Sequence, residues 1–251
     1  SRLDGQRTES ENNVYTLDKD LEILGKIEGL AKDESIYSTR FMGDKLYMVT
    51  FKQVDPFFVI DLSNPKEPEN LGKLKIPGFS RYLHPYDEDT IIGIGRNATS
   101  TGRSRGLKVS LFDVSDFEDP KEVASFVTQE RYAQSTALYE HKAFLFSKEK
   151  NLMVIPAMNR YYSWRTEERE DGYNGAFVFE IAKDEIELRG LVDHSGNANN
   201  YYNPAVERSL YIEDMLYTKS PNLLRINAID DLSSVKNITL KPKEDQDIPI
   251  Y

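Results

Sequence analysis

The chain repeats part of its own sequence, and this repeat limits the folds that it can adopt more than any other feature. An apolar run that ends in Asp and continues into a turn occurs at residues 58–67 and again at residues 110–122. In both copies Ser, then Asn or Asp, and then Pro-Lys-Glu follow the run. Asp and Ser side chains bond to the backbone of their own turn, and Pro prevents a strand from continuing. The sequence therefore predicts a repeated unit of strand, turn and strand.

A second motif recurs after this turn and shows the period of the repeat. It reads Leu-Gly-Lys-Ile at residues 24–27, Leu-Gly-Lys-Leu at 71–74 and Leu-Arg-Gly-Leu at 188–191. Equivalent points of successive repeats lie 43, 52, 67 and 47 residues apart; these points are Asp18, Asp61, Asp113, Glu180 and Asn227. A unit of about 40 to 50 residues with four short strands is typical of a β-propeller blade.

The apolar segments have the residue types and lengths of strands. Residues 45–51 and 56–61 are rich in Val, Ile, Phe, Tyr and Thr, and Gly, Pro, Asn and Asp border such runs along the chain. This composition favours strands bounded by turns. Few windows keep the apolar spacing of an amphipathic helix. We therefore predict an all-β chain of four-stranded antiparallel blades.

The repeat predicts four complete blades and one half blade. The blades are expected at about residues 35–76, 79–128, 133–194 and 204–240, after a half blade of two strands at 12–30. Four blades are the lower limit for a closed propeller, so the chain is either a small ring or a piece of a larger one. We favour the piece, with further propeller sequence of the same chain upstream, since open strand edges need a partner segment.

Composition excludes several classes of function. The absence of cysteine excludes a disulfide scaffold, a thiol nucleophile and a thiolate metal site. A net charge of -10 opposes binding to nucleic acid and to anionic lipid. Because no run approaches ~18 apolar residues, no membrane span is expected. Two glycosylation sequons, at Asn97 and Asn237, leave open whether either asparagine is modified.

Several segments match a known family. They are Thr50–Ser63, Tyr82–Pro85 and Leu111–Asp116, and residues 140–146 and 207–212 extend the match. Together they resemble the secreted prokaryotic proteins that carry a C-terminal β-propeller domain distantly related to WD40 repeats. The resemblance spans about residue 35 to the end of the chain. It implies a secreted or cell-surface protein of greater length, with its export signal upstream, but it implies no reaction, ligand or site residues.

Three long insertions carry an unusual set of side chains. They cover residues 97–106, 159–175 and 195–203, and alternation of strand direction predicts that all three leave the same face of a propeller. The candidate ligand-binding residues in them are Arg103, Arg105, Tyr161, Tyr162, Trp164, Arg165, Tyr201 and Tyr202. Aromatic rings beside guanidinium groups suit a peptide, a glycan or an anionic polymer. The alternative is that these loops pack over the central channel or against a neighbouring blade.

Other chemistry-bearing residues have simpler interpretations. Three histidines, His84, His141 and His194, could form an open zinc site, but no pair has local ligand spacing, so we expect hydrogen-bonded histidines and no metal. The acidic runs at 87–89 and 230–231 fit exposed turns better than a glycosidase pair. A Gly-x-Gly element at residues 93–95 lacks the third glycine of a dinucleotide site.

These observations lead to two functional hypotheses and a third, architectural role. The first is a non-catalytic extracytoplasmic module, without a cofactor, that binds a peptide, protein or glycan partner through its loop-rich face. The alternative is an extracytoplasmic hydrolase or lyase that degrades a polymer at the channel mouth. In the third, another part of the protein carries the chemistry, because fold alone does not define function.

Overall fold

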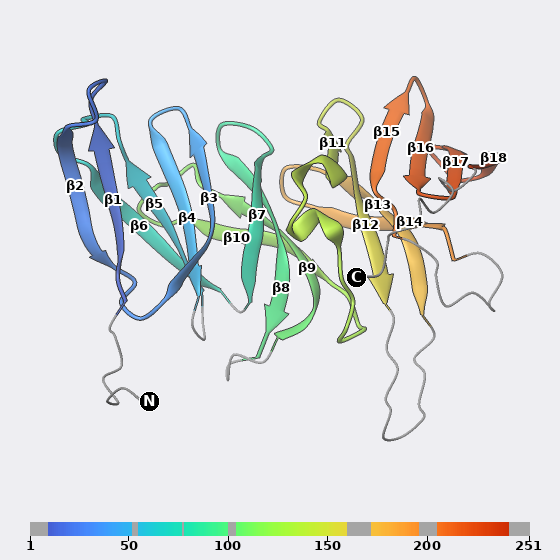
Figure 1. Ribbon diagram of the computed structural model, residues 1–251, viewed down its shortest axis with the longest axis horizontal. Helices are drawn as coiled ribbons and strands as arrows, with labels where there is room; N and C mark the ends of the chain where they lie inside the picture. Colours follow the sequence, from blue (N-terminus) through green and yellow to red (C-terminus); the bar gives the residue numbers. More distant parts are fainter. Residues whose placement is uncertain are drawn as a thin grey trace, which may run out of the picture. The chain divides into compact units, whose positions relative to one another are not determined.

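The structure, a computed structural model, describes residues 10–51, 55–76, 78–99, 104–159, 172–195 and 205–240. These residues form β-strands and two short 3-10 helices (Figure 1), which confirms the all-β prediction. The chain divides into two compact units, residues 1–127 (unit 1) and 128–251 (unit 2), which are described separately. The helices of the described ranges are too short or too polar to cross a membrane.

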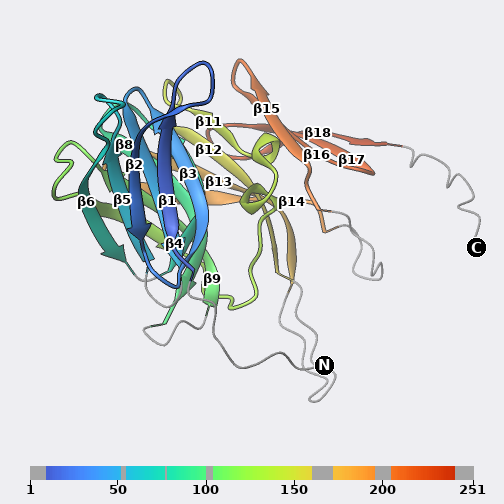
Figure 2. The same ribbon diagram turned by 60° about the vertical axis from the view of Figure 1, so that its left-hand side comes forward.

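Unit 1 contains one two-stranded and two four-stranded antiparallel sheets, which lie side by side in Figures 1 and 2. The first sheet is β1 (Asn12–Leu17) with β2 (Ile23–Leu30). The second is β3 (Ser35–Met42), β4 (Lys45–Phe51), β5 (Asp55–Asp61) and β6 (Glu69–Ile76). The third is β7 (Phe79–Pro85), β8 (Thr90–Ala98), β9 (Ser104–Asp113) and β10 (Lys121–Val127).

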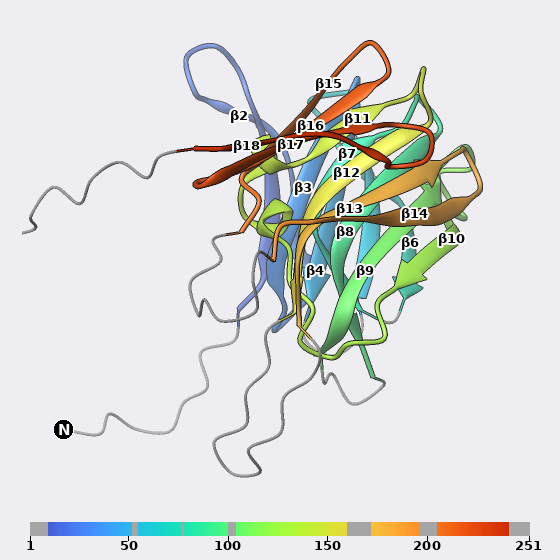
Figure 3. The same cartoon turned by 90° about the vertical axis from the view of Figure 1, so that its right-hand side faces the viewer.

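Unit 2 contains two further four-stranded antiparallel sheets, which face the viewer in Figure 3. Two 3-10 helices, η1 (Thr136–Leu138) and η2 (His141–Ala143), precede β11 (Leu145–Ser147), β12 (Leu152–Asn159), β13 (Tyr173–Ile181) and β14 (Ile186–Asp193). The last sheet is β15 (Arg208–Ile212), β16 (Met215–Ser220), β17 (Leu223–Ala228) and β18 (Ser234–Thr239). The third repeat was expected to start near Ala133. Gln134 forms an isolated bridge with Met158 of β12, and β11 begins at Leu145, after the two helices.

The central strands of each sheet are apolar on both faces because each face packs on a neighbouring sheet. In β4, Leu46 and Met48 pack with Phe58 and Ile60 in the core shared with β1–β2. Tyr47 and Val49 point the other way, into the core shared with β7–β10. Alternate residues of a strand point to opposite faces, so a strand covered on both sides reads as a continuous apolar run.

The recurring Leu-Gly motif has a steric cause in the outer strands. In β6, Asn70 lies opposite Ile60 and Gly72 opposite Val59, so Leu71 is the extra residue of a β-bulge. A Cβ atom on Gly72 would lie 2.3 Å from the carbonyl oxygen of Phe117, in the turn of the neighbouring sheet. A Cβ on Gly25 would likewise lie 2.5 Å from a turn carbonyl of the next sheet. The glycine therefore permits close approach of successive sheets.

The Asp residues of the repeat terminate their strands as the sequence predicts. Asp61 Oδ1 accepts a hydrogen bond from the Ser63 N–H at 2.9 Å, and Asp113 accepts one from Ser115 at the same distance. Asp231 and Ser233 repeat this contact in unit 2. The Ser63 bond and the Lys45 ammonium lower the pKa of Asp61. Each turn is thus closed by its own side chain.

Candidate functional site

The two ends of each four-stranded sheet carry different connections. The first-to-second and third-to-fourth strands are joined at one end, the turn end. The second-to-third connection and the connection to the next sheet leave the opposite end, the loop-bearing end. In unit 2 the connections after Asn159 and after Asp193 both leave the loop-bearing end of the β11–β14 sheet. Because strand direction alternates within each sheet, each long insertion leaves the loop-bearing end of its own sheet, as predicted.

The eight predicted binding residues fall in the three insertions. Seven lie outside the described residues: Arg103, Tyr161, Tyr162, Trp164, Arg165, Tyr201 and Tyr202. Arg105 is described, and it is exposed at the start of β9, opposite Asn97 of β8. It therefore presents a guanidinium group at the loop-bearing end of the β7–β10 sheet.

An aromatic–arginine cluster occupies the loop-bearing end of unit 1. It consists of Tyr37 on β3, Phe51 at the end of β4, and Phe79 and Arg81 on β7. The ring centroids of Tyr37 and Phe79 are 4.8 Å apart, those of Phe51 and Phe79 4.6 Å, and those of Tyr37 and Phe51 5.6 Å. Phe79 is buried, while the other three side chains are partly exposed.

Two β-bulges set the directions of the Tyr37 and Arg81 side chains. Ile36 lies opposite Thr50 and Ser38 opposite Val49, which leaves Tyr37 as the extra residue of β3. Arg81 is the extra residue of β7, by the same irregularity. A bulge redirects its side chain. The Arg81 guanidinium carbon lies 4.9 Å from the centre of the Tyr37 ring and 5.7 Å from that of Phe79, in cation–π geometry.

The backbones beneath the cluster approach closely. Ser38 Oγ donates a hydrogen bond of 2.8 Å to the carbonyl oxygen of Ser80, which joins β3 to β7. A Cβ atom on Gly95 would lie 1.6 Å from the Phe79 carbonyl oxygen, and one on Gly93 would lie 2.5 Å from Ser80 Oγ. The Gly-x-Gly element of β8 therefore serves strand packing.

Sequence reasoning did not select Tyr37, Phe51, Phe79 or Arg81. Their segments read as ordinary strands, and a bulge changes the direction of one side chain without altering the residue types around it. The available signal was the run Phe-Ser-Arg-Tyr after Gly78, where an arginine interrupts an otherwise apolar strand. That signal does not show which aromatic rings the arginine meets.

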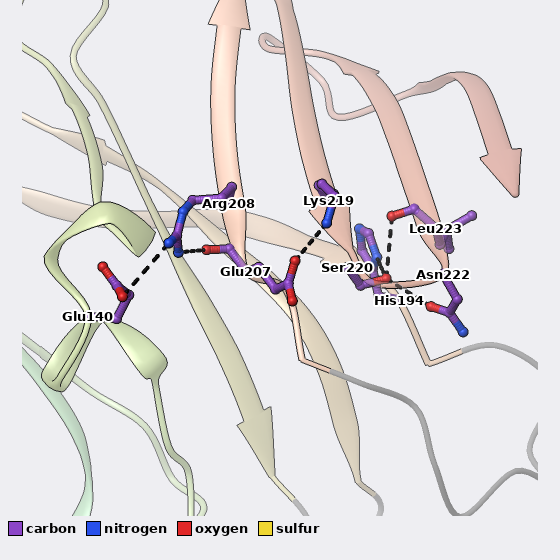
Figure 4. Close-up of polar contacts among 8 residues, drawn as sticks. All are labelled: Glu140, His194, Glu207, Arg208, Lys219, Ser220, Asn222 and Leu223. Carbon is purple, nitrogen blue, oxygen red and sulfur yellow. Dashed lines mark hydrogen bonds and ion pairs between the residues drawn. The ribbon is translucent and has the colours of Figure 1, made fainter. Parts of the chain in front are cut away.

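A network of ion pairs lies at the loop-bearing end of the β15–β18 sheet (Figure 4). Lys219 Nζ donates to Glu207 Oε2 at 2.6 Å, and an Arg208 N–H donates to the Glu207 carbonyl oxygen at 2.6 Å. Arg208 also lies 3.8 Å from Glu140, beside η2. These side chains are about half exposed, so solvent screens the pairs. They form a charged surface of both signs.

His194 is buried beside this network and is hydrogen-bonded at both ring nitrogens. Ser220 Oγ contacts Nδ1 at 3.1 Å, and Thr218 Oγ1 contacts Nε2 at 2.8 Å. Ser220 also donates toward Asn222 Oδ1 and the Leu223 carbonyl oxygen (Figure 4). A hydroxyl has one proton, so Ser220 accepts from Nδ1–H and Nε2 accepts from Thr218. Burial and the nearby Arg225 guanidinium lower the pKa of His194 to about 4.

The other two histidines lie on different elements from His194. His84, on β7 at the turn end, has Nδ1 3.0 Å from the Tyr82 hydroxyl. Burial, with a contribution from Arg40, lowers its pKa to about 4. His141 is exposed on η2 in unit 2. Within the ranges given above, no group of three or more His, Asp or Glu side chains could hold a metal ion.

The acidic runs contain carboxylates that bond to their own turns, and the two sequon asparagines lie on strands. Asp87 Oδ1 accepts from the Asp89 N–H at 3.1 Å, so this acidic run closes its own turn. Bonds from Ser233 lower the pKa of Asp231. Asn237 is exposed on β18, whereas Asn97 is half-buried on β8. The geometry assigns these carboxylates a local structural role.

Repeated meander sheets that pack face to face are the architecture of propeller blades. A sequence profile of the beta propeller domain matches residues 2–232. The chain belongs to the beta propeller domain family. This membership confirms the predicted fold class. The prokaryotic secreted subgroup and the relation to WD40 repeats stay predictions.

Two relatives of this beta propeller are uncharacterized proteins. One, from Methanocaldococcus jannaschii, is 40% identical over 232 residues, which cover 92% of this chain and 32% of the relative. The other, from Archaeoglobus fulgidus, is 41% identical over 216 residues, which cover 86% of this chain and 29% of the relative. The chain thus spans about a third of the length of these relatives.

Solved structures resemble this propeller at low sequence identity. The β-propeller domain of Cps50 (Swd1) from Myceliophteria thermophila is 9% identical with a TM-score of 0.43, and the alignment covers 91% of this chain and 67% of that one. The β-propeller domain of Nup133 from Vanderwaltozyma polyspora is 11% identical with a TM-score of 0.48, over 88% of this chain and 66% of that one.

Proposed function

We propose that this propeller is a non-catalytic binding module that takes up a peptide or glycan at the loop-bearing ends of its sheets. The observation that carries the proposal is the aromatic–arginine cluster of unit 1. Partly exposed Tyr37 and Phe51 supply apolar ring surface, and Arg81 supplies hydrogen-bond donors beside it. Aromatic rings with adjacent arginine are the residue types that dominate binding surfaces.

The cluster has the rigidity that a binding surface needs. Tyr37, Phe79 and Arg81 stand on β3 and β7, which are joined by the hydrogen bond from the Ser38 hydroxyl to the Ser80 carbonyl oxygen. The side chains therefore lose little conformational freedom when a ligand binds, which favours affinity. The exposed Arg105, at the loop-bearing end of the β7–β10 sheet, would extend this surface within unit 1.

Three of the described titratable residues that a polymer-degrading enzyme could use are engaged in local contacts. His194 is neutral and bonded to Ser220 and Thr218, and Asp61 and Asp231 close their own turns. A general acid or base needs a pKa near the working pH and access to substrate. These contacts support the binding module over the hydrolase or lyase, which remains the competing hypothesis.

The proposal includes an extracytoplasmic location, secreted or at the cell surface, as the family resemblance implies. Fractionation of cells that express the complete natural polypeptide tests it. Recovery in the medium or in the envelope is expected, and recovery only in the cytosol would refute the location without affecting the binding proposal.

Ligand titration tests the function directly. Trp164 is the only tryptophan of the chain, so its fluorescence reports on the predicted loop site. We would titrate panels of oligosaccharides and of extended peptides and measure the affinity of any that bind by calorimetry. The double substitution Tyr37→Ala with Arg81→Ala is expected to weaken binding about tenfold or more, because it removes ring surface and a cation.

The matched control is Arg189→Ala, which removes an arginine at the turn end of β13–β14, where it bonds the Ile229 carbonyl oxygen and Glu180. Affinity should be unchanged in this variant. If the cluster variant kept its affinity with an intact circular dichroism spectrum, the cluster would not be the site. If replacement of Tyr161, Tyr162, Trp164 and Arg165 also had no effect, the loop-bearing ends would be excluded. Release of shortened polymer would favour the enzyme.

A further inference from the structure

The β1–β2 sheet exposes an apolar face whose equivalents in the next two sheets are buried. The exposed fractions are 44% for Tyr15, 48% for Leu17 and 60% for Ile23, and Leu21 and Leu24 beside them are also exposed. We call these five residues the open face. Large apolar side chains gathered in this way are unusual on a soluble surface and mark a contact site.

Strand register identifies the equivalents of the open face in the next two sheets. Leu17 lies opposite Ile23, directly before the bulge in the outer strand. The same register position is held by Ile60, opposite Asn70, and by Phe112, opposite Glu122. Ile60 and Phe112 are both 0% exposed. Leu17 is therefore the exposed member of a position that is buried in the following repeats.

In both of those repeats the position faces the preceding sheet. Ile60 packs in one core with Leu30, Val14 and Ile27 of the β1–β2 sheet. Phe112 stacks on Phe57 of the β3–β6 sheet, with ring centroids 4.8 Å apart. Leu17 and Tyr15 alternate with Val14, which points to the β3–β6 sheet, so they point away from it. The open face is thus where a preceding sheet would pack.

The edge of β1 is also incomplete in comparison with its equivalent. Strand β5 pairs with both β4 and β6, whereas β1 pairs with β2 alone among the described strands. A strand edge with unpaired N–H and C=O groups is a template for another strand. Additional strands would therefore cover the open face and pair with the edge of β1.

We propose that the open face and the β1 edge are an interface for further propeller polypeptide of the same protein, in which two strands complete the β1–β2 sheet and another blade covers Tyr15, Leu17 and Ile23. The occupant is expected to present apolar residues at the positions that Tyr47, Val49, Phe57 and Val59 hold, since these four form the face that β3–β6 offers to the next sheet. The relatives, of which the chain spans 32% and 29%, have the length to supply such blades. This interface is independent of the proposed ligand-binding function.

The absence of cysteine allows a direct test by thiol labelling. Leu17→Cys would be introduced into the 251-residue chain and into the complete natural polypeptide that contains it, and its reaction with a disulfide reagent would be timed. The matched control is Val123→Cys, at a strand residue that is 40% exposed on β10. Leu17→Cys should react about tenfold or more slowly in the complete polypeptide, because reaction there requires local opening. Val123→Cys should react at similar rates in both.

Equal rates for Leu17→Cys in the two polypeptides would overturn the proposal. A second copy of the chain is the competing occupant, and sedimentation velocity distinguishes it. Protection that appears in the 251-residue chain as its concentration rises, together with a dimeric mass that Leu17→Glu abolishes, would assign the face to self-association and refute the proposed occupant.

Discussion

The turn ends and the loop-bearing ends of the sheets are stabilised in different ways. At the turn ends an Asp side chain bonds a backbone N–H two residues later, as Asp61 does with Ser63. At the loop-bearing end of unit 1, Arg81 meets Tyr37 from a different sheet, more than 40 residues away in sequence. Neighbouring sheets meet at both ends, but the turn is closed by a local side-chain bond, whereas the cluster exists only where two repeats meet.

The largest expected effect tests the close approach at the loop-bearing end. Gly95→Ala would place a Cβ atom 1.6 Å from the Phe79 carbonyl oxygen, so the strands must separate. The free energy of unfolding should fall by about 3 kcal/mol. Gly43→Ala is the control at a turn end: its Cβ meets no atom within 4 Å, and its φ of +54° costs only about 1 kcal/mol. Urea unfolding measures both, and equal losses would contradict the comparison.

A fall in pH should lower the free energy of unfolding through His84 at a turn end and His194 at a loop-bearing end. The pKa of His194 and that of His84 are lowered from 6.5 to about 4 by burial. Between pH 6.5 and 4 the unfolded chain binds more protons, so stability is complete above pH 6.5 and is lost as pH falls toward 4. Each histidine accounts for up to about 3 kcal/mol, less for the partly exposed His84.

The variants His194→Gln and His84→Gln separate the two contributions. Each should flatten the dependence of the unfolding free energy on pH between 6.5 and 4, and His194→Gln should flatten it more. Titration by NMR of the imidazole protons gives the two pKa values directly. A folded-state pKa near 6.5 for either histidine would remove that residue from the account.

A smaller effect is expected where the turn is local. Asp113→Ala removes the acceptor for the Ser115 N–H and should lower the free energy of unfolding by about 1 kcal/mol. The control Asp119→Ala removes an exposed carboxylate that pairs with the exposed Lys121. That variant should change stability by less than about 0.5 kcal/mol. Thermal unfolding compares them, and an equal effect would mean that the turn bond adds nothing.

The smallest effect should come from the ion pairs of unit 2. Lys219→Ala breaks the 2.6 Å contact with Glu207, yet both side chains are nearly half exposed. A double-mutant cycle with Glu207→Gln should give a coupling energy of about 0.5 kcal/mol that declines in high salt. A coupling several times larger would show that this network is a structural element comparable to the aromatic–arginine cluster.

The fold was predictable because its signals are short and repeated. The Asp61 and Asp113 turns, the Leu-Gly motifs and the alternating strands each depend on neighbours within one or two strands, and the structure confirms the all-β class that they indicate. The candidate site was harder to predict from the sequence. Tyr37 and Arg81 meet because each is the extra residue of a bulge, and a bulge in one strand is defined only by its partner.

The predicted loop residues illustrate the same limit. Alternation of strand direction was enough to assign the long insertions to one end of each sheet, and Arg105 lies there. It could not show which rings would gather at that end. His84 and His194 are hydrogen-bonded as expected, but only the tertiary structure, through burial and the nearby Arg225, makes His194 neutral.

By itself, the sequence determined the repeat, the four-stranded units and the turns that close them, because those depend on steric limits and side-chain hydrogen bonds within a few residues. The tertiary structure decided which face of each strand is covered, which glycines face a carbonyl oxygen and which arginine lies on which ring. These depend on the neighbouring repeat. Leu17 and Ile60 occupy the same place in their repeats, and one is exposed and the other buried only because of what packs beside them.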